Sequence, residues 1–313
     1  MMGKEASVAQ QVAGVRTEQE IASQPACWRR AAAVAGDVAG LLPAPGERVA
    51  VVGCGTSWFI AQSYAAARED SGQGETDAFT ASELPLGRRY DRTLFLSRSG
   101  TTTEIQAAAE RVRGASLTVA ITTGALTPVG LAVDEVIDLA FADEESVVQT
   151  RFATTELALL RAHLGIDVEV SARAAERVLA APVPAELLAA RQFTFLGTRW
   201  TYGLANEAAL KLREAAGMWT ESYPAMEYRH GPAAVTGKHS VVWLFGPAPG
   251  GLADDIALAG GLAWTADADP MAALVRVHLV ALEKARAAGL DPDQPRNLTR
   301  SVILAPAEPG RAS

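Results

Sequence analysis

Short apolar runs alternate with longer amphipathic segments along most of the chain. The short runs are bounded by glycine and polar residues, as buried parallel strands are, and the longer segments have helical periodicity. The expected strands are 48–53, 93–96, 117–122, 135–139, 193–197, 241–245 and 261–265. The expected helices are 18–42, 57–69, 103–113, 146–164, 200–216 and 271–288, with a short helix near Asp254 and a loop at 125–130. Strands that alternate with helices in this way predict an α/β fold with parallel sheets.

Two distant segments share one layout. Residues 49–64 (VAVVGCGTSWFIAQSY) and 193–208 (FTFLGTRWTYGLANEA) both run from an apolar strand through glycine and a small turn into a helix. Any two strand–glycine–helix units share part of this pattern, but similarity at so long a spacing favours two copies of one subdomain. The predicted organisation is a polar leader (1–26), a first subdomain (27–168), a helical, proline-interrupted connection (169–191) and a second subdomain with a C-terminal tail (192–313).

Composition narrows the classes of partner. The 313 residues are 49% hydrophobic and 20% charged, which suits a large folded core. The net charge is −8 and no lysine or arginine cluster is present, so nucleic acid and anionic membrane are disfavoured, while a small anionic ligand in a local positive pocket is allowed. Cys27 and Cys54 match neither a disulfide framework nor a metal site. With no apolar run of about 20 residues and no signal-like N-terminus, the expected location is the cytoplasm.

A glycine-rich turn, GCGTS (53–57), joins a predicted strand to a predicted helix. Backbone N–H groups at a helix start, together with the helix dipole, favour an anion there. Trp58 occupies the third glycine position of a dinucleotide site, and no lysine follows as in a P-loop. A purely structural turn therefore remains an alternative to anion binding.

A second turn, LSRSGTTTE (96–104), is rich in hydroxyl groups. Hydroxyl and N–H donors with one cation, Arg98, suit a phosphate monoester. The alternative is a helix N-cap closed by Glu104 as a capping box, but a cap needs one hydroxyl and does not explain five. The hydroxyl groups belong to Ser97, Ser99, Thr101, Thr102 and Thr103.

Candidate acid–base groups follow in the second part of the chain. Glu207, Lys211 and Glu214 are spaced by four and three residues, so they share one face of the helix at 200–216. An exposed ion-pair stripe would have the same spacing. His230, in the polar segment ESYPAMEYRHGP, is a candidate proton-transfer partner for this helix.

Four segments in order, GCGTS, SRSGTTTE, NEAALKLREAAGMWTESYPAMEYRHGP and QPRNLTRSV, resemble the tandem sugar-isomerase (SIS) domain family over residues 27–303. The likeness is to the isomerase half of glucosamine-6-phosphate synthase and to stand-alone amino-sugar-phosphate deaminase/isomerases and fructosamine-6-phosphate deglycases. The resemblance implies two Rossmann-like, flavodoxin-type parallel sheets flanked by helices. It also implies a homodimer with a shared active site, and no metal or organic cofactor.

The resemblance also assigns roles to residues. Glu214 matches the glutamate that moves protons between adjacent sugar carbons, and His230 matches a histidine that assists ring opening from the neighbouring subunit. Lys211 lies on the same helix as Glu214, and the backbone near Val147 lines the sugar site. The sugar-phosphate cradle is expected to contain Thr56, Ser57, Ser97, Arg98, Ser99 and Thr102.

The chain departs from the synthase at two places. Arg300 replaces the lysine that forms a Schiff base there, and arginine stays protonated, so it is expected to hold substrate electrostatically. Of the four lysines, only Lys211 lies in a matched motif, and no covalent imine with the enzyme is expected. No glutaminase segment or N-terminal nucleophilic cysteine is present in the sequence, so ammonia from glutamine is not expected to be used.

The predicted activity is that of a sugar-phosphate isomerase/deaminase. It resembles a glucosamine-6-phosphate deaminase, with an aldose–ketose proton shift and loss of an amine. A fructosamine-6-phosphate deglycase is the alternative within the enzyme class. A non-catalytic sugar-phosphate-binding regulator is the alternative of another class, which the pairing of Glu214 with His230 disfavours.

Overall fold

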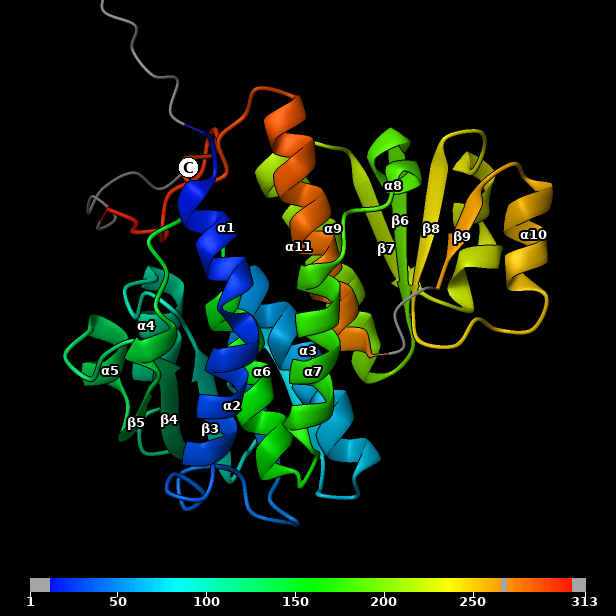
Figure 1. Ribbon diagram of the computed structural model, residues 1–313. Helices are drawn as coiled ribbons and strands as arrows, with labels where there is room; N and C mark the ends of the chain where they lie inside the picture. Colours follow the sequence, from blue (N-terminus) through cyan, green and yellow to red (C-terminus); the bar gives the residue numbers. More distant parts are fainter. Residues whose placement is uncertain (1–11, 266–268, 306–313) are drawn as a thin grey trace, which may run out of the picture.

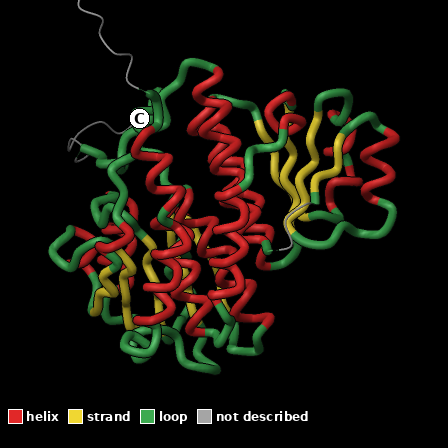
Figure 2. Tube along the Cα trace, viewed as in Figure 1, coloured by secondary structure: helices red, strands yellow, loops and turns green. Residues whose placement is uncertain are grey.

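Two parallel sheets lie on either side of a block of helices (Figures 1 and 2) in the computed structural model, which describes residues 12–265 and 269–305. The first sheet has the order β2-β1-β3-β4-β5 and the second the order β7-β6-β8-β9. The strands are β1 Val49–Gly53, β2 Thr76–Thr80, β3 Arg92–Leu96, β4 Leu117–Thr122, β5 Glu135–Asp138, β6 Gln192–Gly197, β7 Thr220–Pro224, β8 Ser240–Phe245 and β9 Leu262–Trp264. Both orders are of the flavodoxin type, with strand order reversing beside the first strand. The predicted fold class is confirmed. We call the part with the first sheet the first half and the part with the second sheet the second half.

The helices form a central layer and two outer groups (Figure 1). Helices α2, α3, α6, α7, α9 and α11 lie between the sheets, α4 and α5 cover the far face of the first sheet, and α10 covers that of the second. The helices are α1 Val15–Ala22, α2 Gln24–Val34, α3 Thr56–Asp70, α4 Thr103–Val112, α5 Pro128–Ala132, α6 Arg151–His163, α7 Val168–Ala180, α8 Ala185–Ala189, α9 Trp200–Ala216, α10 Leu252–Leu258 and α11 Pro270–Ala287.

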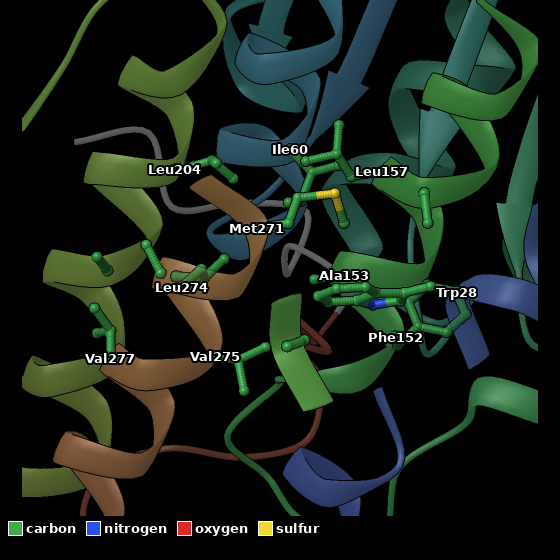
Figure 3. Packing of buried hydrophobic residues seen from close by; sticks show 14 of the residues in the cluster. Trp28, Ile60, Phe152, Ala153, Leu157, Leu204, Met271, Leu274, Val275 and Val277 are labelled. Atoms are coloured by element: carbon green, nitrogen blue, oxygen red, sulfur yellow. The ribbon is translucent and has the colours of Figure 1, made fainter. Parts of the chain in front are cut away.

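One hydrophobic cluster joins both halves through the central helices. In β1, Val49 and Val51 face this cluster, while Ala50 and Val52 face the outer layer, because side chains alternate along a strand. Figure 3 shows side chains from α2, α3, α6, α9 and α11 meeting in the cluster, including Trp28, Ile60, Leu157, Leu204 and Met271. The two sheets are therefore packed around a shared interior.

Several elements differ from their predicted form. Strands β2 (TDAFT) and β7 (TESYP) were not predicted, because these half-buried edge strands lack a continuous apolar run. The predicted helix 18–42 is divided at Ser23 into α1 and α2. The predicted loop 125–130 contains the start of α5.

The predicted helix 146–164 begins only at Arg151. The Glu144 carboxylate accepts hydrogen bonds from the N–H groups of Thr150 (2.6 Å), Arg151 (2.7 Å) and Phe152 (3.2 Å), and so caps α6 from outside the helix. A glutamate seven residues before the first residue of the helix is not a local capping signal, so the boundary was misplaced. Residues 143–150 consequently form a loop, which we call loop 143–150.

Part of the predicted leader is folded. Helix α1 packs against α11, and Ile21 is fully buried. The Glu20 carboxylate accepts from the N–H groups of Glu145 (2.6 Å) and Ser146 (3.2 Å), so this segment also holds loop 143–150. Residues 1–11 of the leader lie outside the described residues, and the proposed domain limits stay predictions.

Candidate active site

A cavity of about 190 Å³ lies at the carboxyl ends of β1 and β3, where the strand order reverses. Ligands of open parallel sheets bind at this switch point. The walls come from the turn after β1, the start of α4, loop 143–150, α9 and residues 298–302 of the C-terminal tail. We call it the substrate cavity. Its walls combine segments from both halves of the chain.

Close packing of α3 against α9 assembles the charged part of the site. Gly203 of α9 touches α3 so closely that an added Cβ would lie 2.3 Å from the carbonyl oxygen of Phe59. At the same crossing, the Asn206 amide donates to the side-chain oxygen of Gln62 at 2.7 Å. This contact brings Thr56, the first residue of α3, beside the acidic and basic side chains of α9.

Lys211 is the centre of a buried cluster. Its Nζ donates to Thr56 Oγ1 at 2.9 Å, forms an ion pair with Glu207 Oε1 at 3.4 Å and binds the Glu214 carboxylate. Thr56 Oγ1 also donates to Glu207 Oε1 at 3.3 Å. Lys211 and Glu207 are each only 1% exposed, so the alternative of an exposed ion-pair stripe is wrong.

In this cluster, burial and the neighbouring opposite charges shift the pKa values of Glu207 and Lys211 in opposite directions. Burial raises the pKa of the Glu207 carboxyl to about 7, although the Lys211 ammonium lowers it. Burial alone would favour a neutral lysine, but Glu207 and Glu214 outweigh it and raise the pKa of Lys211 above its ordinary value. Lys211 is therefore held as an ammonium, which is a poor nucleophile. Glu214 remains 21% exposed at the cavity wall, where a ligand can reach it.

The hydroxyl-rich loop after β3 folds into a tight turn at the other side of the cavity. Ser97 Oγ accepts from the N–H of Gly100 and Ser99 Oγ accepts from that of Thr101, both at 3.2 Å. The N-cap residue of α4 is Thr102, whose side chain makes no cap hydrogen bond, so the alternative of a Ser/Thr N-cap closed by Glu104 is wrong. The Thr102 side chain instead belongs to the cavity lining.

The C-terminal tail lies across this loop, beside the start of α4 in Figure 1. The carbonyl of Val302 accepts from the N–H of Thr103 at 3.2 Å, and Thr101 Oγ1 donates to Ser301 Oγ at 2.9 Å. The tail therefore forms one wall of the cavity and occupies donors at the start of α4.

Two arginines predicted to contact the ligand hold protein segments together, and of these two Arg300 also lines the cavity. The Arg98 guanidinium is 1% exposed and donates to the carbonyls of Ser146 (3.0 Å), Val147 (3.3 Å) and Arg300 (3.2 Å). The Arg300 guanidinium binds the Asp143 carboxylate and the carbonyl of Glu144. Arg98 does not line the cavity, because its side chain is directed at loop 143–150. Both arginines fasten this loop to the tail, which places Val147 in the cavity wall.

Three further predicted residues do not line the cavity. Ser57 is 3% exposed in the first turn of α3 and Ser97 is equally buried, so both lie behind the lining. His230 is exposed at the end of the 3-10 turn Glu227–His230, after β7, and is not part of the cavity lining that contains Glu214. Its supply from a neighbouring subunit stays a prediction.

Residues absent from the predicted site also line or support the cavity. Gln149 is part of the lining, and its buried side-chain oxygen has no partner among the described residues. Nothing in the local sequence marks Gln149, because the contact depends on how loop 143–150 is tied down. Glu207 was visible through its spacing from Lys211, but its burial was not.

Within 12–265 and 269–305, no group of three histidine, cysteine, aspartate or glutamate side chains is arranged to hold a metal ion. In the same ranges, no helix has both the length and the apolar character needed to cross a bilayer.

Several known proteins are similar to this chain in sequence or in fold. The chain is 29% identical over 319 residues to a glutamine–fructose-6-phosphate aminotransferase of Gloeobacter violaceus, covering 82% of this chain and 52% of that protein. Its fold matches a glucosamine-6-phosphate deaminase of Thermotoga maritima (TM-score 0.75, 22% identity, 92% of this chain and 100% of that one). It also matches the C-terminal domain of glucosamine-fructose-6-phosphate aminotransferase from Francisella tularensis (TM-score 0.70, 18% identity, 90% and 98%).

These similarities confirm the resemblance to the tandem sugar-isomerase family that the motifs indicated. The chain spans about half the length of the aminotransferase that it matches. No family model matches the chain.

Proposed function

We propose that this protein is an enzyme that moves a proton between two adjacent carbons of a phosphorylated amino sugar and releases the amine. One observation carries the proposal: Thr102 of the hydroxyl-rich turn lines the same small cavity as Lys211 and Glu214 of the buried charged cluster. The similarity to an aminotransferase that uses fructose 6-phosphate, and the shared fold with a glucosamine-6-phosphate deaminase, support the same chemistry.

The phosphate would bind at the start of α4, where Thr102 lines the cavity and the helix dipole favours an anion. Fixing the phosphate at one end leaves the first two carbons of an open-chain sugar toward Glu214 at the other end. The Glu214 carboxylate would remove a proton from one of these carbons and return it to the other. Lys211 would keep the carboxylate in position through their ion pair.

The amine then leaves by hydrolysis. In glucosamine 6-phosphate, the proton moves from C2 to C1, the C2–N bond becomes an imine, and water releases ammonia and fructose 6-phosphate. In a fructosamine 6-phosphate, the proton moves from C1 to C2 and water at the C1 imine releases the amine and an aldose 6-phosphate. Acid–base groups are sufficient for either proton shift.

A direct assay tests the proposal. The protein is incubated with glucosamine 6-phosphate and with a fructosamine 6-phosphate, and ammonia, free amine and the hexose phosphate are measured. We expect turnover of at least one compound and none with unphosphorylated glucosamine. Tight binding without turnover would support a sugar-phosphate-binding regulator, and equal binding of glucosamine and its phosphate would contradict the cradle.

We also propose a homodimer in which His230 of one subunit assists ring opening in the other. The exposed position of His230, away from Glu214 of its own chain, is compatible with such an arrangement. Mixing Glu214→Gln and His230→Ala variants should restore part of the activity through mixed dimers. A monomer by light scattering, or no restoration after subunit exchange, would contradict the shared site.

A further inference from the structure

A second cavity, of about 460 Å³, adjoins the substrate cavity. Glu214 lines both. The other walls of the second cavity come from the end of α9, the segment after α11 and the start of the tail, at residues 294–297. Figure 1 shows this segment leaving the end of α11 and crossing toward the tail. A group bound at Glu214 therefore has open space on the side away from the phosphate cradle.

The acidic groups in this second cavity already have partners. Glu214 is paired with the Lys211 ammonium. The Asp291 carboxylate accepts from the N–H groups of Gly14 at 2.9 Å and Asp293 at 3.1 Å. The Glu214 charge is thus offset by an ammonium, while Asp291 accepts both of its hydrogen bonds through Oδ1.

The basic groups retain unused donors. Among the described residues, Arg213 donates through Nη1 alone, to Thr220, at 3.0 Å to the carbonyl and 3.5 Å to the hydroxyl. Arg296 is exposed and, within the part of the chain that the structure describes, has no hydrogen-bond or ion-pair partner. Guanidinium groups bind carboxylates through paired N–H donors, so the free capacity of this cavity suits a carboxylate.

We propose that the second cavity is a leaving-group cavity, which binds the carboxylate of an amino acid attached to the sugar nitrogen, with Arg296 as a specificity-determining residue. This inference rests on the proposed function. Ammonia would need no such space, whereas an α-amino acid places its carboxylate one carbon from the nitrogen. The proton moves from C1 to C2, and water adds to the C1–N imine. The C–N bond then breaks to give an aldose 6-phosphate and the free amino acid.

Two substrates that differ by one carboxylate test the proposal. They are the ketose 6-phosphates that carry glycine or methylamine on C1, and kcat/KM is measured for both, with glucosamine 6-phosphate as a third compound. The wild type should prefer the glycine conjugate by about tenfold or more, as expected for one charge-assisted contact. Arg296→Gln should remove most of that preference and leave the methylamine conjugate almost unchanged.

Matched controls separate charge from general damage. Arg177, an exposed arginine on α7, provides the control Arg177→Gln, which should keep the preference. Arg296→Lys retains a charge without the paired donors and should keep only part of the preference. Calorimetric binding of both conjugates to wild type and Arg296→Gln gives a readout that needs no turnover.

The outcomes are distinguishable. Equal kcat/KM and equal affinity for the two conjugates, or a loss in Arg296→Gln that is the same for both, would overturn the leaving-group cavity. Conversion of the methylamine conjugate without preference would overturn it while leaving the proposed function intact. If no compound is converted, the proposed function fails. The binding preference, present or equal, then decides whether the cavity recognises a carboxylate.

Discussion

The two halves of the molecule share a scaffold and differ in chemistry. Each begins with a strand that ends in glycine, and an added Cβ would lie 2.4 Å from backbone of the next turn at Gly53 and 2.3 Å at Gly197. The residue before each following helix has the same unusual backbone, φ 54° and ψ −123° at Gly55 and φ 52° and ψ −123° at Arg199. The turn geometry is therefore common to both halves even where the residue is not glycine.

The loops after the third strand of each half show where the two diverge. After β3 the sequence is SRSGTTT, and after β8 it is GPAPGG. The second loop contains no hydroxyl group, so the proposed phosphate loop has no equivalent at this position of the second half. The two sheets share their strand order, while the side chains that follow the third strand differ.

Helices α3 and α9 occupy equivalent positions in the two halves, but the glutamate and lysine side chains of the cluster are on α9. With an offset of 144 residues (199 − 55), Glu207, Lys211 and Glu214 of α9 correspond to Ser63, Ala67 and Asp70 of α3. Glu214 and Gly55 both line the substrate cavity. Their counterparts, Asp70 and Arg199, instead bind each other as an ion pair. In the proposed function, the acid–base groups thus come from the second half and the phosphate donors from the first.

The largest expected difference between the two halves is between Glu214 of α9 and its counterpart Asp70 of α3. Glu214→Gln keeps the shape and removes the base, so turnover should fall by roughly 10²–10⁴-fold while binding persists. Asp70→Asn, the matched change in the other helix, should leave turnover unchanged. Steady-state kinetics on an authenticated substrate provides the measurement. Normal turnover by Glu214→Gln would show that the two helices do not differ in the proposed way.

The phosphate loop gives the next largest effect. Thr102→Val removes one hydroxyl donor from the cavity, and a hydrogen bond to a charged group contributes enough that affinity for the sugar phosphate should fall about 10- to 100-fold. Ala248→Ser adds a hydroxyl to the corresponding loop of the second half and should not change affinity. Calorimetric titration measures both. Unchanged binding in Thr102→Val would remove this residue from the cradle.

Burial of Glu207 should make stability depend on pH. Its pKa of about 7 in the folded chain exceeds the ordinary 4.5, so the folded state binds more protons between these values. The free energy of unfolding should therefore fall as pH rises through this range, by at most about 1.4 kcal/mol per pH unit from this group. Glu207→Gln should flatten that part of the profile in urea unfolding. Ser63→Ala, at the counterpart position, should retain the wild-type slope.

The shared turn geometry predicts the smallest effect. At both Gly55 and Arg199 the positive φ favours glycine, so glycine should be more stable than alanine by about 1 kcal/mol. Gly55→Ala should lower the melting temperature, and Arg199→Gly should melt above Arg199→Ala, since both lose the same ion pair. Equal melting temperatures for the two Arg199 variants would mean that the second turn stores no strain.

The sequence alone determined the parts of this protein that depend on local pattern. Apolar runs bounded by glycine predicted most strands, and helical spacing placed Glu207, Lys211 and Glu214 on one face of α9. The similarity between residues 49–64 and 193–208 indicated two related halves, which the common strand order confirms. Such features are encoded within one turn of helix or one strand, so neighbouring residues suffice to predict them.

Contacts between distant segments were decided only by the tertiary structure. The burial of Lys211 follows from the close approach of α3 at Gly203, and the directions of Arg98 and Arg300 follow from loop 143–150 and the tail. The larger cavity beside Glu214 exists because segments near residues 214 and 296 meet. Desolvation and cavity shape depend on which surfaces pack together, and spacing along the chain does not specify that packing.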